Sequence, residues 1–204
     1  VHPQDENNQD ENKMRIIGGQ HRGTKLVELA NDKTRPTSDR VRESIFNILS
    51  GGRFGMPLPG GIVIDLFAGT GALGLEALSR GAARSYFVEN EASALAVLRA
   101  NISKLKRAGD CTVIAANATS LAAWRGERAD VVFADAPYES GDGLTAIAGL
   151  GRIGALAPNA VLVVETGKQE MLVPDILAEA GFGIVDARAY GKAMVHILKT
   201  RANA

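Results

Sequence analysis

Four consecutive residues, Asp135-Ala136-Pro137-Tyr138, combine hydrogen-bond acceptors with an aromatic ring. The Asp135 carboxylate and the Ala136 carbonyl match the two protons of an exocyclic amino group, and Tyr138 offers a flat surface on which a base can stack. Such a nitrogen is a poor nucleophile because its lone pair is delocalised into the ring. Two acceptors can aim that lone pair at an electrophile and stabilise the positive charge that develops on attack. The alternative interpretation is an ordinary tight turn at the end of a strand.

A second candidate site is the segment 62–74, which runs from an apolar strand through a glycine-rich turn into a helix. Gly69, Gly71 and Gly74 match G-x-G-x-x-G, a pattern shared with dinucleotide enzymes. Asp65 precedes this turn and would repel a pyrophosphate; it either accepts a hydrogen bond from a ligand's ammonium or orients the loop. Glu89 ends the next strand, about 20 residues after the first glycine, where a carboxylate can accept from both ribose hydroxyls.

The two acids favour a ligand that carries positive charge and no phosphate. S-adenosylmethionine has an ammonium, a sulfonium and no phosphate, so the sequence predicts it as the cofactor. The structural alternative is a glycine turn that only packs a helix on a strand, with Asp65 capping the helix. The candidate cofactor-binding residues of this region are Asp65, Phe67, Ala68, Gly69, Thr70, Gly71, Glu89 and Asn90.

Short apolar runs alternate with helical stretches from residue 61 onward, which predicts an α/β fold with a mainly parallel sheet covered on both faces. Gly191 joins the last two strands too tightly for a crossover helix, so these strands must be antiparallel. Because ligands of open α/β sheets bind beyond the carboxyl ends of the strands, the glycine loop and residues 135–138 should lie close together. The expected strands are 62–66, 84–89, 111–115, 130–134, 160–165, 183–190 and 192–199, and the expected helices are 72–80, 91–106, 118–124, 143–152 and 173–180.

The region before this sheet has a different pattern. Residues 1–13 are polar and without periodicity, which predicts a disordered arm or a tag. Residues 14–29 predict a hairpin with glycines in its turn, and Thr37 or Ser38 is expected to cap a helix with Val41 and Ile45 on its apolar face. Five glycines and two prolines in 51–61 mark a boundary. We therefore expect an arm 1–13, an N-terminal extension 14–53 and a core 54–204.

Composition excludes several classes of protein. Hydrophobic residues make up 46% and charged residues 23% of the chain, which excludes wholesale disorder, collagen and coiled coils. Cys111 is the single cysteine, which excludes a disulfide framework, and no metal is expected. No apolar run approaches the roughly 20 residues needed to cross a bilayer, and no signal peptide is visible. We therefore expect a cytoplasmic protein with no membrane partner.

Charge is unevenly distributed although the 23 basic and 23 acidic residues cancel. Residues 14–50 carry seven basic and four acidic side chains, a net of +3. Such a segment favours a polyanionic partner, with an ordinary solvated surface as the alternative.

Residues 14–199 resemble the RsmD family, bacterial methyltransferases that modify guanine N2 in small-subunit ribosomal RNA. The segments 14–23, 34–43, 65–82 and 135–138 carry the likeness, and 34–43 is the more family-specific of them. The resemblance implies a Rossmann-like class I fold that uses S-adenosylmethionine. That fold has a seven-stranded, mostly parallel sheet with an antiparallel last strand, here preceded by a β-hairpin and a helix. It also implies catalytic roles for Asp135, Ala136, Pro137 and Tyr138.

Further residues take on expected roles through this resemblance. Asn117 and Ala118 occupy the place where such enzymes contact adenine. Ala136 departs from the family pattern, which usually has proline there; alanine keeps the carbonyl and loses rigidity. The expected partner is small-subunit ribosomal RNA or the small subunit, contacted by a monomer. The candidate RNA-binding residues are Arg22, Arg35, Arg40 and Arg42.

Three other function classes remain open at this stage. One is a different amino-group methyltransferase, acting on DNA adenine or a protein glutamine. Another is a catalytically weak RNA-binding relative, and the last is a nicotinamide oxidoreductase. The basic segment disfavours glutamine, the lack of a target-recognition domain disfavours sequence-specific DNA modification, and Asp65 with residues 135–138 disfavours the oxidoreductase.

Overall fold

A computed structural model of the chain describes residues 14–30, 39–138, 140–170, 172 and 174–200. Within these ranges, no helix has the length and apolar character needed to cross a membrane. The elements are α1 (Asp39–Ser50), β1 (Ile62–Leu66), α2 (Ala72–Ser79), β2 (Arg84–Glu89), α3 (Ala92–Lys104), η1 (Ala108–Asp110), β3 (Cys111–Ala115), η2 (Ala118–Ser120), β4 (Ala129–Asp135), α4 (Asp142–Arg152), β5 (Leu156–Gly167), α5 (Pro174–Glu179), β6 (Phe182–Tyr190) and β7 (Ala193–Thr200).

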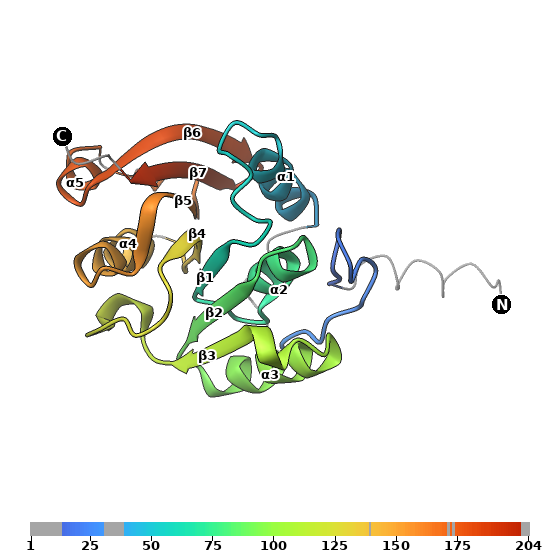
Figure 1. Ribbon diagram of the computed structural model, residues 1–204. Helices are drawn as coiled ribbons and strands as arrows, with labels where there is room; N and C mark the ends of the chain where they lie inside the picture. The colour runs from blue at the N-terminus through green and yellow to red at the C-terminus, as the bar shows by residue number, and fades with distance from the viewer. Residues whose placement is uncertain (1–13, 31–38, 139, 171, 173, 201–204) are drawn as a thin grey trace.

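The strands form one seven-stranded sheet in the order β3-β2-β1-β4-β5-β7-β6 (Figure 1). Strands β3, β2, β1, β4 and β5 are parallel to one another, and β7 is antiparallel to both β5 and β6. The order reverses between β1 and β4, because β1 pairs with β2 on one side and with β4 on the other. This is the switch point beyond which open α/β sheets bind their ligands. The expected sheet, including its antiparallel last strand, is confirmed.

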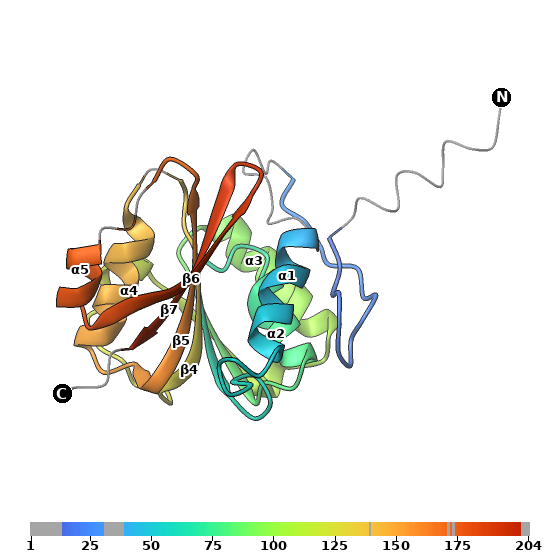
Figure 2. The same cartoon turned by 90° about the horizontal axis from the view of Figure 1, so that it is seen from above.

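Helices cover both faces of the sheet, as Figure 2 shows, with α1, α2 and α3 on one side and α4 and α5 on the other. The central strands are therefore buried on both faces and read as continuous apolar runs. In β4, Val131 and Phe133 join the hydrophobic cluster under α1–α3, while Val132 and Ala134 join the cluster under α4 and α5. Alternate residues of one strand thus serve two separate cores.

The N-terminal region shares a core with the sheet. Met14, Ile16 and Leu26 belong to the same buried cluster as Val63 of β1, and Phe46 of α1 lies 5.5 Å from Phe133 of β4, centroid to centroid. The boundary predicted between residues 53 and 54 therefore does not coincide with a break in the packing.

Two expected elements differ from the structure. The predicted hairpin in 14–29 consists of a turn closed by a single antiparallel bridge, Arg15 to Lys25. The predicted helix 118–124 is wrong: only the short η2 forms, and the chain then continues without regular structure. There, Trp124 packs edge-on against Tyr86 at 4.9 Å and donates to the Glu127 carbonyl, so tertiary contacts replace a helix. The predicted arm 1–13 and the caps Thr37 and Ser38 lie outside the described residues.

Candidate active site

Four carboxylates line the carboxyl ends of four adjacent strands, on the side of the sheet that α1–α3 cover. Side chains alternate across a strand, and each acid comes two residues after a core residue of that side. Those core residues are Phe87, Val63, Phe133 and Val163. We call this set the acidic row; in sheet order β2-β1-β4-β5 its members are Glu89, Asp65, Asp135 and Glu165.

Asp65 is the most buried acid of the row, at 2% exposure. Its Oδ2 accepts a hydrogen bond of 2.8 Å from the Gly74 amide, one of the first-turn donors of α2 that have no partner inside the helix. Burial raises the pKa of Asp65 well above its usual value; the Gly74 bond opposes the shift, and the charges of Asp135 and Glu89 add to it. Asp65 therefore holds the start of α2, a contact that fits both its predicted role of orienting the loop and the alternative of a helix-capping carboxylate. Its charge also interacts with the charges of Asp135 and Glu89.

Glu89 holds the other side of the glycine turn. Its Oε2 accepts from the Gly69 amide, and its Oε1 accepts from the Asn90 and Glu91 amides, each at 2.8 Å. A carboxylate has about four lone-pair positions, so these three bonds leave room for a further donor such as a ribose hydroxyl. Glu89 is 9% exposed, so it is fixed in place at the edge of the site.

The turn itself depends on glycine at two positions. Gly71 has φ 80°, and a Cβ there would lie 2.4 Å from Leu98 Cδ1. A Cβ at Gly74 would lie 2.4 Å from Phe87 Cε1, so only glycine lets α2 approach β2 this closely. Phe67 also has a positive φ of 57°, an uncommon conformation for a bulky residue that is found chiefly at functional sites.

The far side of the turn is held by the N-terminal segment. Asn101 is fully buried, and its Nδ2 donates to both the Thr70 and the Val27 carbonyls at 3.0 Å, while its Oδ1 accepts from the Val27 amide. The Thr70 hydroxyl donates to the Met14 sulfur at 3.2 Å. Thr70, a predicted cofactor contact, is 6% exposed and is fixed mainly by these bonds.

The chain that leaves β3 passes the end of β2, where the Ala116 amide donates to the Glu89 carbonyl at 3.0 Å. Asn117 is the next residue. Asn117 caps η2: its Oδ1 accepts from the amide and the hydroxyl of Thr119, both at 2.9 Å. The carbonyl expected to pair with adenine is thus already used twice. Ala118 is buried at 6% exposure, whereas Asn90 is exposed.

Residues 135–138 continue directly from β4 to the same edge of the sheet. Asp135 is the last residue of β4, and Ala136 is 7% exposed. The Tyr138 ring is 46% exposed, but its hydroxyl donates to Glu165 Oε1 at 2.7 Å. Sequence analysis did not include Glu165 in the site, although its place at the end of an expected strand was a usable signal.

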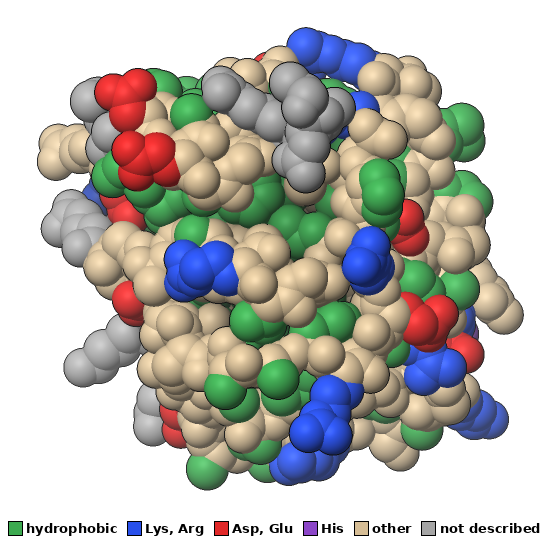
Figure 3. Space-filling view, turned by 60° about the vertical axis from the view of Figure 1, so that its left-hand side comes forward, with side chains coloured by type: hydrophobic (Ala, Val, Ile, Leu, Met, Phe, Trp, Pro, Cys, Tyr) green, Lys and Arg blue, Asp and Glu red, His purple; other side chains and the backbone are tan. Residues whose placement is uncertain are grey.

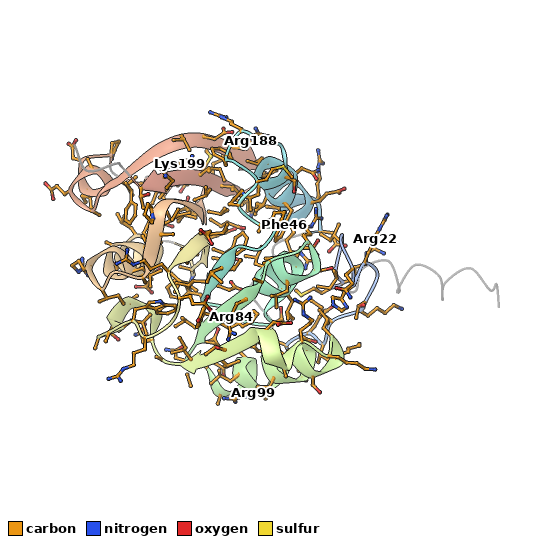
Figure 4. The ribbon with its side chains drawn as sticks, in the orientation of Figure 1. Arg22, Phe46, Arg84, Arg99, Arg188 and Lys199 are labelled. Atoms are coloured by element: carbon orange, nitrogen blue, oxygen red, sulfur yellow. The ribbon has the colours of Figure 1, made fainter. Side chains whose placement is uncertain are left out.

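The predicted RNA-binding arginines separate into three groups. Arg22 and Arg40 are exposed, and Arg22 lies on the outer edge of the N-terminal turn (Figure 4). Arg35 lies outside the described residues. Arg42 differs from the expectation: it is 1% exposed, and its Nη2 donates to the Arg15 carbonyl at 3.0 Å and to Asp39 Oδ1 at 2.6 Å. In this structure, therefore, the Arg42 side chain is not exposed to a partner at the surface.

Figure 3 shows the side of the molecule that α4 and α5 cover. Its described Lys and Arg side chains stand apart from one another among hydrophobic and other atoms and form no continuous patch there.

Two further polar residues, missed by sequence analysis, fix the N-terminal segment. The fully buried Glu76 accepts from the Ile17 and Gly18 amides at 2.7 and 2.8 Å and pairs with Arg80 at 2.6 Å. The Ser79 hydroxyl donates to the Gly18 carbonyl at 2.6 Å. We call Glu76, Ser79 and Asn101 the anchor. A charged residue inside the apolar helix 72–80 was the available signal for Glu76.

The arrangement suits a cationic ligand. No salt bridge within the described residues involves Asp65 or Glu89. A cation of a ligand would therefore be their counter-ion, and it would favour the charged form of Asp65 that burial disfavours. An ammonium and a sulfonium meet this need, whereas a pyrophosphate would be repelled. The residues present therefore fit S-adenosylmethionine.

Comparisons with known proteins agree with this geometry. The family described as Conserved hypothetical protein 95 matches residues 14–199. The chain is 40% identical over 160 residues to Ribosomal RNA small subunit methyltransferase D of Escherichia coli (strain K12), covering 78% of each chain. It is 37% identical over 186 residues to the protein of the same name from Haemophilus influenzae, covering 87% of this chain and 93% of that one. A solved structure of the yhhF protein from Escherichia coli has a TM-score of 0.78 at 34% identity, covering 94% of this chain and 99% of that one.

Proposed function

Because this chain belongs to the family of Ribosomal RNA small subunit methyltransferase D, the RsmD family, we propose that it methylates the exocyclic N2 amino group of a guanine in small-subunit ribosomal RNA. The methyl donor is S-adenosylmethionine. The observation that carries the proposal is the acidic row, which lies beside an aromatic side chain at one edge of the sheet.

The glycine turn and two acids of the row form the cofactor half of the site. When bound, S-adenosylmethionine supplies a methyl group on a positively charged sulfur. Asp65 and the turn would hold its amino-acid end, and the remaining acceptor position of Glu89 would accept from a ribose hydroxyl. Ala118 and the Asn117 backbone would border the adenine, since the Asn117 carbonyl oxygen is already bonded to Thr119.

Residues 135–138 form the substrate half. The Asp135 carboxylate and the Ala136 carbonyl would accept the two protons of the guanine amino group and turn its lone pair toward the methyl group. As the nitrogen gains positive charge, the Asp135 carboxylate stabilises it. Tyr138 would stack on the base, and its 46% exposure leaves a ring face for this purpose. Ala136 in place of the usual proline keeps the acceptor, so catalysis is expected to survive.

The substrate is proposed to reach this edge from the N-terminal side. Arg22 and Arg40 are exposed there and would contact RNA phosphates. We propose further that the protein acts as a monomer in the cytoplasm, on free small-subunit ribosomal RNA or on the assembled subunit.

Asp135→Ala tests the proposal most directly. We expect single-turnover methyl transfer to fall on the order of 10²-fold or more, the scale for losing one preorganised electrostatic partner. The affinity for S-adenosylmethionine should change much less, because Asp65, the turn and Glu89 remain. The assay uses tritiated cofactor and small-subunit ribosomal RNA from a strain that lacks the enzyme, followed by nucleoside analysis to identify the methylated atom.

Asp175→Ala is the matched control, since it removes an exposed aspartate from α5. A folded Asp135→Ala protein with the wild-type rate would contradict the mechanism. A methyl group found on an atom other than guanine N2 would contradict the assigned substrate.

A further inference from the structure

The Tyr138 hydroxyl is hydrogen-bonded to a residue near the end of β5, although Tyr138 itself is exposed to solvent. It donates to Glu165 Oε1 at 2.7 Å, and Glu165 is only 8% exposed whereas Tyr138 is 46% exposed. Core packing does not explain why the hydroxyl of such an exposed ring is hydrogen-bonded to a buried carboxylate. The bond therefore needs another explanation.

The base of the ring lies next to Gly167. This residue comes two positions after Glu165 on the same side of β5, and a Cβ added there would be 3.5 Å from both Cβ and Cγ of Tyr138. The side chain thus starts beside Gly167 and reaches Glu165 with its hydroxyl. It lies along the end of β5, and only a residue without a side chain leaves this space open.

In the sheet, Glu165 is the register partner of Asp135, so the residue that supports the ring and the residue that would hold the amino group lie side by side. Both end rigid strands, which suits a site that must keep a fixed geometry.

We propose that Glu165 is a positioning residue that holds the Tyr138 ring in the orientation in which its face meets the target base. This inference rests on the proposed function. An exposed tyrosine samples several rotamers, and a charge-assisted bond to a carboxylate removes that freedom before the base arrives. The base then stacks on a preorganised surface, next to the acceptors that orient its amino group.

The test is a double-mutant cycle on single-turnover methyl transfer with saturating cofactor and RNA. Glu165→Ala and Tyr138→Phe should each slow transfer about 10-fold, the scale of a lost hydrogen bond to a charged group. The double variant should be no slower than either single variant, because both changes remove the same bond. Glu165→Gln should keep most of the rate, since its amide carbonyl still accepts from the hydroxyl.

A second readout follows the ring without using activity. The chain has three tyrosines, so 3-fluorotyrosine labelling gives three fluorine resonances, and the one lost in Tyr138→Phe is assigned to Tyr138. We expect Glu165→Ala to shift that resonance clearly and Glu165→Gln to shift it less. Glu179→Ala, which removes an exposed glutamate from α5, is the control and should leave all three resonances and the rate unchanged.

Rate losses that multiply in the double variant would overturn the inference, as would a Tyr138 resonance unmoved by Glu165→Ala. A Glu165→Ala protein that is less stable but transfers methyl groups at the wild-type rate would also overturn it. If the wild-type protein transfers no methyl group to RNA, the proposed function fails and the stacking role fails with it. If Glu165→Ala still shifts the Tyr138 fluorine resonance in that case, Glu165 positions the ring and only the proposed function is wrong.

Discussion

The acidic row and the anchor lie on two sides of the same glycine turn and use the same residue types differently. In the anchor, Glu76 has a cation of its own, Arg80, and its carboxylate fixes two amides from a segment 58 and 59 residues away. In the row, Glu89 accepts amides from its own turn and strand end and forms no salt bridge with any described residue. A buried carboxylate with its counter-ion supplied is a structural element, whereas one without it is available to a ligand.

Removing the anchor carboxylate should give the largest effect. Glu76→Ala leaves Arg80 without its partner and the Ile17 and Gly18 amides without acceptors, so we expect the free energy of unfolding to fall by about 3–5 kcal/mol. Urea denaturation measures this loss. Glu127→Ala is the matched control, because Glu127 also pairs with an arginine but is 59% exposed, and it should cost less than about 1 kcal/mol. Equal losses in both variants would contradict the distinction between the two regions.

The corresponding change in the acidic row should act on the ligand instead. Glu89→Ala is expected to weaken S-adenosylmethionine binding by about 1–3 kcal/mol, the scale of a lost hydrogen bond between a hydroxyl and a charged carboxylate. Isothermal titration calorimetry measures the affinity. Glu91→Ala removes the neighbouring exposed acid, which caps α3, and should leave the affinity unchanged. Wild-type affinity in folded Glu89→Ala protein would remove Glu89 from the site.

The outer surface of the N-terminal region should affect RNA only. Arg22→Ala combined with Arg40→Ala should weaken RNA binding and lower its salt dependence by roughly 0.7–0.9 in slope for each phosphate that the protein no longer neutralises. Arg128→Ala combined with Arg152→Ala removes two other exposed arginines and serves as the control. Filter binding at several salt concentrations measures both pairs. Identical slopes would mean that the basic segment is only a solvated surface.

The smallest effect concerns the cost of burying the Asp65 charge. Its pKa is raised in the folded protein, so its contribution to stability is greatest below the usual value of 3.8 and is lost as pH rises through the raised pKa. Asp65→Asn keeps an acceptor for the Gly74 amide and has no charge. We expect the melting temperature of the variant to increase relative to that of the wild type as pH rises from 4 to 8. The variant should also bind the cofactor more weakly than the wild type does. A constant difference in melting temperature across this range would show that the Asp65 charge is not costly.

The sequence predicted the strands well because local patterns determine them. Strands 62–66, 84–89 and 111–115 match the structure residue for residue, since short β-branched runs end at clear turn signals. Asp65 and Glu89, the acids of the first two of these strands, followed from the same reasoning. The contacts of Arg42 and Glu165 could not be predicted, because the partner of each lies on another element: the Arg15 carbonyl for Arg42 and the Tyr138 hydroxyl for Glu165. The helical pattern of the sequence shows that Arg42 lies near the apolar face of α1. It does not show that other parts of the chain bury the Arg42 side chain.

The docking of the N-terminal segment also sets the order in which the chain can fold. Val27 finds its partner on Asn101, 74 residues later in the chain. At a synthesis rate of roughly 5–20 residues per second, about 4–15 s pass between the two residues being made. Met14, Ile16 and Leu26 join a buried cluster that extends to Val161 and Ile197, so their core is complete only after late parts of the chain have been made. Until then the nascent chain exposes part of an apolar segment that a chaperone can bind, and the long sequence separation of these contacts predicts slow folding.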